Sequence, residues 1–133
     1  MSPLVSMVVP VLDDTGPAQQ LLAQLGHEPE VEIILVDGGR DELLEQSVRA
    51  RHSARFLRTS PGRAHQMNTG AGAASGEWLL FLHADSRLPE GWRSAVANIP
   101  EHVIGGWFRF ALDDSAWQAR VIERLVAWRV RWL

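Results

Sequence analysis

The 133-residue chain contains no cysteine and no lysine. The absence of cysteine excludes disulfide bonds, thiolate zinc sites and cysteine nucleophiles, and it is compatible with a reducing compartment. The absence of lysine excludes a Walker-type phosphate loop and Schiff-base chemistry, since both need an amine. No apolar run approaches the roughly 20 residues of a membrane-spanning helix, and the N-terminus lacks the basic head of a signal peptide. We therefore expect a cytoplasmic protein.

The remaining composition is that of one soluble globular domain over residues 1–133. Hydrophobic residues make up 46% of the chain and charged residues 22%, which is typical of an ordinary domain with a sizeable core. The formal net charge is -3 and no basic face is apparent, so we expect no nucleic acid partner.

Apolar strand patterns alternate with helical patterns along the first 98 residues. The sequence predicts strands over 5–11, 31–36, 54–59 and 77–82, and helices over 16–25, 41–51, 63–74 and 92–98. This alternation predicts an α/β fold with a Rossmann-like, mainly parallel sheet flanked by helices. In such a sheet, ligands bind at the carboxyl ends of the strands.

Four acids follow the predicted strands: Asp13, Asp14, Asp37 and Asp85. We expect them along one edge of the sheet, where carboxylate oxygens would suit Mg²⁺ or Mn²⁺ bound together with the phosphates of a substrate. The alternative is that acids after strands are turn formers and helix caps. For one acid this alternative is stronger, and for four on one edge the cation site is favoured.

The glycine-rich segment 70–76 is superficially like a dinucleotide-binding fingerprint. It comes late in a predicted helix and precedes a strand, whereas a true fingerprint follows a strand and opens a helix. Close packing of helix on sheet is therefore the better interpretation, and no NAD is expected. A response-regulator domain would also fit the alternation, but it should carry a late lysine, which this chain lacks.

Four segments in order carry a family resemblance: VVPVLDD at 8–14, LVDGG at 35–39, GRAHQMNTGA at 62–71 and FLHADSRLP at 81–89. Together they resemble glycosyltransferase family 2, in the bacterial subgroup whose metal motif reads His-Ala-Asp. The likeness covers essentially the whole chain. It implies a GT-A fold, a nucleotide-diphosphate sugar as donor, and Mn²⁺ or Mg²⁺ on the diphosphate.

The resemblance assigns the metal to Asp85, with His83 as a second ligand. A cation held there would neutralise the charge that develops on the diphosphate leaving group. His83 stands where the family usually has the first acid of Asp-X-Asp, and the alternative is a strand-end histidine that only packs.

Asp37 resembles the family acid that hydrogen-bonds the nucleobase, which favours a UDP-sugar, and Gly62 and Arg63 would place a helix N-terminus and a guanidinium at the diphosphate. Alternatives are a solvated Arg63, a helix-capping role for Asp13 or Asp14, and hydrogen bonds from Gln66 and Asn68 to neighbouring loops. The full set expected to bind the nucleotide-sugar is Pro10, Asp13, Asp14, Asp37, Gly38, Gly62, Arg63, Gln66, Asn68, His83 and Ala84.

Beyond residue 98 the sequence predicts a strand over 104–110, entered through a glycine pair. Trp107 in it is expected either to form a wall near the donor sugar or to be buried in the sheet. Residues 117–133 predict an amphipathic helix with one apolar stripe and with Arg120, Arg124 and Arg131 turned away from it. The stripe is Trp117, Val121, Leu125, Trp128 and Trp132.

That stripe is expected to pack against the domain or against a second copy in a homodimer. The alternative is contact with an anionic membrane surface at its inner, cytoplasmic face, where a lipid-linked acceptor would be found.

An inverting transferase needs a carboxylate to deprotonate the acceptor hydroxyl. Members of the family run on into an acidic segment that supplies this base, so the present chain is expected to be truncated. Asp113 and Asp114 are weak candidates for the catalytic base. Two functions remain open: an active glycosyltransferase, and a catalytically silent nucleotide-sugar-binding or assembly module.

Overall fold

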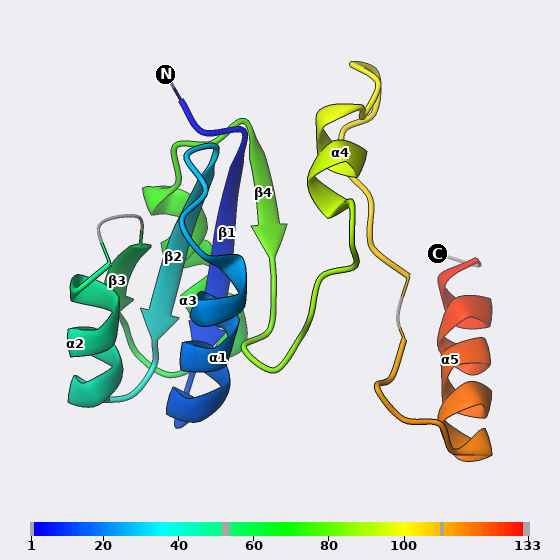
Figure 1. Cartoon of the computed structure of the whole chain (residues 1–133), viewed down its shortest axis with the longest axis horizontal. Coiled ribbons are helices and arrows are strands. Elements are labelled where there is room, and N and C mark those ends of the chain that lie inside the picture. The colour runs from blue at the N-terminus through cyan, green and yellow to red at the C-terminus, as the bar shows by residue number, and fades with distance from the viewer. Residues whose placement is uncertain (1, 52–53, 110, 132–133) are drawn as a thin grey trace. The chain divides into compact units, whose positions relative to one another are not determined.

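The computed structural model describes residues 2–51, 54–109 and 111–131, and the chain divides into two compact units, residues 1–98 and 99–133. In the described residues of the second unit there is one helix, α5 (Trp117–Val130). A single domain over 1–133 stays a prediction, and each unit is described by itself. The first unit contains, in chain order, β1 (Val5–Val11), α1 (Thr15–Leu25), β2 (Val31–Asp37), α2 (Glu42–Arg49), β3 (Ala54–Arg58), α3 (Arg63–Ala73), β4 (Trp78–Phe81) and α4 (Trp92–Ala97) (Figure 1).

The four strands form one parallel sheet in the order β3-β2-β1-β4. Parallel neighbouring strands are connected by crossover helices, which cover both faces of the sheet. Because the central strands are then buried on both faces, their sequences are almost continuously apolar. The central strand β1 is buried at all positions except the half-buried Pro10. This architecture confirms the predicted α/β class and is consistent with the GT-A fold.

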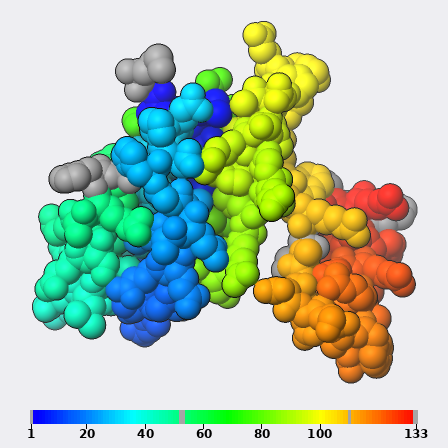
Figure 2. Space-filling model, in the orientation of Figure 1, coloured from blue at the N-terminus to red at the C-terminus, as the bar shows by residue number. Residues whose placement is uncertain are grey.

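Helices cover both faces of the sheet, with α1 and α3 on opposite sides (Figure 1). Glycine allows α3 to approach closely, because a Cβ added at Gly70 would lie only 2.4 Å from Cγ1 of Val8 and 3.0 Å from Cγ2 of Val36. The prediction that the glycine-rich segment serves helix–sheet packing is therefore confirmed at Gly70. On the other face, α1 lies in front of the sheet (Figure 1), and α1 and α2 lie at the surface in the space-filling view of the same side (Figure 2).

The predicted elements of the first unit are confirmed within one or two residues at each end. Helix α1 ends before Gly26, whose φ of 60° is the left-handed conformation that favours glycine. Helix α2 starts after Asp41, because the Asp41 side chain caps it by accepting a hydrogen bond from the backbone N–H of Leu44.

The predicted strand over 104–110 is wrong for the residues that the structure describes. Residues 103–109 form no strand, and Phe110 lies outside the described residues. A strand needs a partner for its backbone hydrogen bonds, and the described part of this segment has none. Trp107 is 75% exposed, so the alternative of a tryptophan buried in the sheet is wrong as well.

Helix α5 confirms the predicted C-terminal helix as far as Val130, while Trp132 and Leu133 lie outside the described residues. The expected direction of its arginines needs correction. Arg124 lies one helical turn before Trp128 and Arg131 one turn after it. Both arginines therefore border the apolar stripe and do not point away from it. Within the described residues, no helix combines the length and apolar character needed to cross a bilayer.

Candidate functional site

The point where β1 and β4 separate is the topological switch point of the sheet. Trp78 N donates to Leu4 O and Leu82 N donates to Val8 O, so alternate residues of β1 face β4. The next residue in this series is Pro10, which has no N–H to offer. Pairing with β4 therefore ends here, whereas pairing with β2 continues to Val11. Open parallel sheets bind ligands at this position.

Asp13 and Asp14 follow β1 directly at the switch point, and both are exposed. Asp13 has a φ of 56°, an uncommon backbone conformation for a residue with a side chain. Asp14 is the N-cap residue of α1 by position, but its side chain makes no capping hydrogen bond. The helix-cap alternative therefore does not account for the Asp14 carboxylate, which leaves its oxygens available to a ligand.

The segment after β4 forms a tight turn that presents two polar side chains. Ser86 N donates to His83 O at 3.0 Å, with Ala84 buried at the turn and His83 and Asp85 exposed on either side of it. In the described chain, neither the imidazole of His83 nor the carboxylate of Asp85 has a hydrogen-bond or ion-pair partner.

A carboxylate beside an imidazole is a donor set that fits Mn²⁺ or Mg²⁺, with the carboxylate as the preferred ligand. Across the parts of the chain that the structure covers, no group of three or more His, Asp or Glu side chains converges. Coordination of a cation by Asp85 and His83 stays a prediction.

Asp37, at the end of β2, lies in a different environment because it is only 1% exposed. Its carboxylate accepts hydrogen bonds from Gly39 N at 2.8 Å and from Asp41 N at 3.0 Å. Arg58 Nε lies 3.6 Å from its Oδ2 atom. The structure thus shows Asp37 holding the loop after β2, and its hydrogen bond to a nucleobase stays a prediction.

Gln66 also has its hydrogen-bonding groups engaged inside the protein. Its amide donates to Val11 O at 2.7 Å and to Val36 O at 2.8 Å, and its Oε1 accepts from Gly62 N at 3.3 Å. The side chain therefore ties the ends of β1 and β2 to the start of α3. The alternative named only neighbouring loops, whereas two of the three partners are strand residues. Gly38 packs here, because an added Cβ would lie 3.0 Å from Gln66 Cδ.

Helix α3 begins at this same edge of the sheet. Its N-cap residue Gly62 has a φ of 142°, which favours glycine, and Arg63 is an exposed first residue. The N-terminus of the helix and the guanidinium both favour an anion. Asn68 is exposed further along the helix, so it does not share the buried position of Gln66.

Two contacts in this region escaped the sequence interpretation. Arg58 is the register partner of Asp37 on β3, and the Thr15 hydroxyl donates to Oδ2 of Asp41. That hydrogen bond, together with the one from Leu44 N, lowers the pKa of the Asp41 carboxyl. Both contacts join residues far apart in sequence. The strand register brings Arg58 beside Asp37, whereas no local pattern signals the contact of Thr15 with Asp41.

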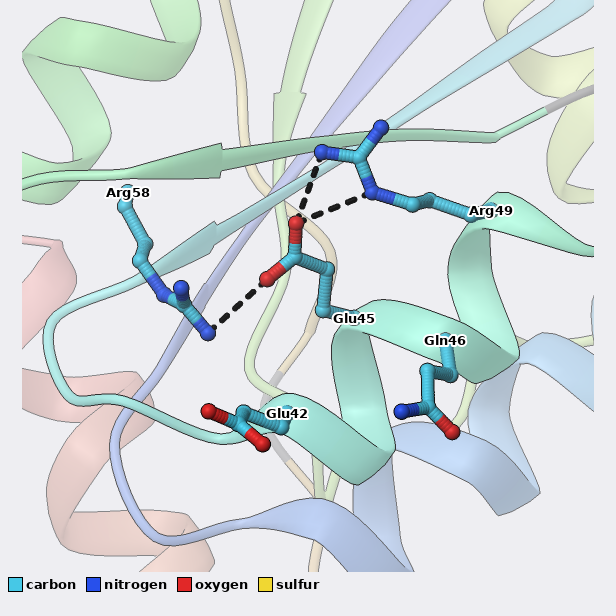
Figure 3. Close-up of a pocket in the computed structure, with 5 residues that line it drawn as sticks. All are labelled: Glu42, Glu45, Gln46, Arg49 and Arg58. Carbon is cyan, nitrogen blue, oxygen red and sulfur yellow. Dashed lines mark hydrogen bonds and ion pairs between the residues drawn. The ribbon is translucent and has the colours of Figure 1, made fainter.

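A shallow hollow of 270 Å³ between α2 and β3 is lined by Glu42, Glu45, Gln46, Arg49 and Arg58 (Figure 3). Glu45 lies between the two arginines, 2.7 Å from Arg49 Nη2 and 2.9 Å from Arg58 Nη2. The charges of Glu45, Arg49 and Arg58 are thus paired with one another. Through Arg58 these ion pairs extend to Asp37, so they support the loop after β2.

The weak candidates for the catalytic base belong to the second unit. Asp113 and Asp114 lie exposed in the loop before α5. The Asp114 carboxylate accepts a hydrogen bond from Ala116 N at 2.8 Å. Their role as a base stays a prediction.

Comparison with known proteins identifies the family. The family model described as Glycosyl transferase family 2 matches residues 18–121. Similar curated proteins from Mycobacterium bovis (strain BCG / Pasteur 1173P2) and Mycobacterium tuberculosis (strain ATCC 25177 / H37Ra) are each named PGL/p-HBAD biosynthesis glycosyltransferase. Each is 33% identical over 111 residues, covering 76% of this chain and 43% of the relative, so the chain spans less than half the length of these relatives. The parallel sheet, the His-Ala-Asp turn after β4 and these matches agree, and the chain belongs to glycosyltransferase family 2.

Proposed function

We propose that the switch point between β1 and β4 binds a nucleotide-diphosphate sugar together with Mn²⁺ or Mg²⁺. The observation that carries the proposal is the set of exposed acids there with no structural task. Asp14 does not cap its helix, and Asp85 has no partner among the described residues, although both follow strands of the sheet. Exposed carboxylates at the ligand-binding edge of an α/β sheet suit a divalent cation.

In this proposal Asp85 holds the cation, and His83 is a second ligand or a hydrogen-bond donor to the diphosphate. When bound, the cation neutralises the negative charge that grows on the departing nucleoside diphosphate. Arg63 and the start of α3 favour the same anion from the neighbouring position. Gln66 holds the end of β1, after which Asp13 and Asp14 follow, and Asp37 holds the loop after β2.

The donor that we favour is a UDP-sugar, with the loop of Asp37 and Gly38 placed at the base and Pro10, Asp13 and Asp14 at the nucleoside. We propose an inverting transfer, in which the oxygen of the acceptor hydroxyl attacks the anomeric carbon while a carboxylate removes the proton of that hydroxyl. Asp113 and Asp114 are the candidates for that base, and the proposed acceptor is lipid-linked. The reaction would take place in the cytoplasm.

Calorimetric titration tests the donor site. UDP-glucose, UDP-N-acetylglucosamine, GDP-mannose and UDP would each be titrated with and without Mn²⁺ into the wild type, Asp85→Ala and Glu77→Ala. Glu77 is the matched control because it is an exposed acid that precedes β4, at the opposite end of the strand from Asp85. We expect binding that needs Mn²⁺, is lost in Asp85→Ala and is kept in Glu77→Ala. Binding that is indifferent to Mn²⁺ and to Asp85 would refute the proposed site.

A second candidate function is a silent nucleotide-sugar-binding or assembly module. It is favoured by the side chain of Asp114, one oxygen of which accepts a hydrogen bond from Ala116 N. The two functions differ in turnover. Release of UDP from the bound donor, lost in Asp85→Ala, supports the transferase, whereas Mn²⁺-dependent binding without any UDP release supports the binding module.

A further inference from the structure

Helix α5 presents a large apolar face that its own unit leaves uncovered. Trp117 is 71% exposed and Trp128 64% exposed, and Leu125 and Val121 between them are also exposed. These four residues, here called the tryptophan face, follow one another at the three- and four-residue spacing that puts them on one side of a helix. Exposing two tryptophans of one short helix to water is unfavourable, and a contiguous exposed apolar surface of this kind usually marks an interaction site.

The opposite side of α5 is fixed inside the second unit. Ala119 and Glu123 are buried. The Glu123 carboxylate accepts a hydrogen bond from Leu112 N at 2.7 Å and forms an ion pair with Arg120 Nη1 at 2.7 Å. Arg120 also donates to Asp114 O at 2.6 Å. These contacts fix the orientation of the helix about its own axis. The tryptophan face is therefore on the side of the helix that points away from the rest of this unit.

The charges beside the tryptophan face are all positive. From Trp117 to Arg131 the sequence contains four arginines and one glutamate, and that glutamate is already paired with Arg120. In the part of the chain described, the remaining three, Arg124, Arg129 and Arg131, have no acidic partner. Helical spacing puts Arg124 and Arg131 on one border of the face and Arg129 near the other.

We propose that the tryptophan face of α5 lies on a lipid surface that contains anionic headgroups. Tryptophan rings favour the boundary between headgroups and acyl chains, and arginines beside them can reach the phosphates while their stems stay in the apolar layer. Each arginine near an anionic leaflet adds to the attraction. The inference stands on the second unit alone and does not depend on the proposed donor site.

The same charges argue against a second copy of the chain as the occupant. A two-fold interface brings the same patch of both subunits together. Such a dimer would face the unpaired arginines of one helix with those of its partner, and like charges brought together oppose association. An anionic surface instead matches every charge that borders the face.

Co-sedimentation with vesicles tests the proposal on the full chain. The probes are vesicles of phosphatidylcholine alone and of phosphatidylcholine mixed with phosphatidylglycerol. We expect binding to the anionic vesicles only, lost in the double variant Trp117→Ala, Trp128→Ala. Trp107→Ala is the matched control, because Trp107 is an exposed tryptophan of the same unit outside the helix. It should bind as the wild type does.

A second pair of variants keeps the test valid if loss of two tryptophans disturbs α5. Arg124→Gln with Arg129→Gln should weaken binding to anionic vesicles by about thirtyfold, whereas Arg49→Gln, an exposed arginine of α2, should leave it unchanged. Equal binding to neutral vesicles, or none to either, would overturn the proposal. So would a concentration-dependent dimer that dissociates in the tryptophan variant, because a second copy would then be the occupant.

Discussion

Both halves of the carboxyl edge of the sheet carry aspartates, but these differ in whether their carboxylates are hydrogen-bonded to the protein. At the β2–β3 half, Asp37 and Asp41 accept hydrogen bonds from backbone N–H groups, and Arg58 lies against Asp37. At the β1–β4 half, the exposed Asp14 and Asp85 carboxylates have no such bonds to the described residues. In the first half, here called the framework half, the carboxylates hold the loop backbone. In the second half, the carboxylate oxygens of Asp14 and Asp85 are available to a ligand.

This difference teaches that hydrogen bonds, rather than residue type or position after a strand, separate structural acids from candidate ligand acids. A buried carboxylate must have its oxygens satisfied by the protein. An exposed carboxylate is satisfied by water and can exchange that water for a cation. The alternative of acids as turn formers is therefore right for the β2 end, while it does not account for Asp14 and Asp85.

The largest expected effect on the free energy of unfolding comes from removing a hydrogen-bonded acid, compared with removing an exposed acid. Asp37→Ala removes the acceptor of two backbone N–H groups and leaves Arg58 beside an uncharged position. We expect the free energy of unfolding to fall by about 2–4 kcal/mol, measured by urea titration followed by circular dichroism. Asp85→Ala should change it by less than about 0.5 kcal/mol. Equal destabilisation by both variants would break the comparison.

The next effect concerns the packing of α3, which carries Gln66 to the framework half. Gly70→Ala forces a Cβ to within 2.4 Å of Val8 Cγ1 in the core, and we expect a loss of about 1–3 kcal/mol in the free energy of unfolding. Gly72→Ala is the matched control on the same helix, because no atom of another element lies within 4 Å of the added Cβ. It should stabilise the protein by about 0.5–1 kcal/mol. A neutral Gly70→Ala would contradict the close helix–sheet approach.

The smallest effect concerns Asp41, the cap of α2. Asp41→Ala should cost about 1 kcal/mol at neutral pH through loss of the cap. The hydrogen bonds from Thr15 and Leu44 lower the pKa of Asp41 in the folded protein below the ordinary value of 3.8. Its stabilising contribution is therefore complete above that value and is lost as the pH falls through the lower folded pKa.

Urea titrations of the wild type and Asp41→Ala over a series of acidic pH values measure this loss. The difference between the two should shrink as the solution becomes more acidic. Glu42→Ala, a change of the neighbouring exposed acid, should show a smaller cost. A difference that grows with acidity would mean that the Asp41 carboxylate does not stabilise the fold.

The sequence was sufficient for the parallel α/β architecture because its signals are local. Apolar β-branched runs marked β1 and β2, and glycine marked the end of α1 and the start of α3. Asp41 was expected inside its helix and is instead the cap, which depends on a side-chain rotamer that periodicity does not encode.

The errors on the strand and on burial arose where structure depends on distant partners, whereas the direction of Arg124 and Arg131 follows from helical spacing alone. The segment 104–109 has strand-like residues but no pairing partner in the described chain, so it forms no strand. Likewise, the pattern of residues could not tell that Asp37 would be buried and Asp85 exposed, because burial depends on Gln66, Arg58 and the loop contacts. The assignment of Asp85 as the metal ligand stays a prediction.

The strand order described above also favours an order of assembly in time. Strand β1 pairs on one side with β2, which begins at Val31, and on the other with β4, which begins at Trp78. Closing the longer loop costs more chain entropy, so the β1–β2 pair can form before β4 is captured. In a chain that folds in this sequence, the framework half of the edge is complete first, and the turn that carries Asp85 arrives with the last strand.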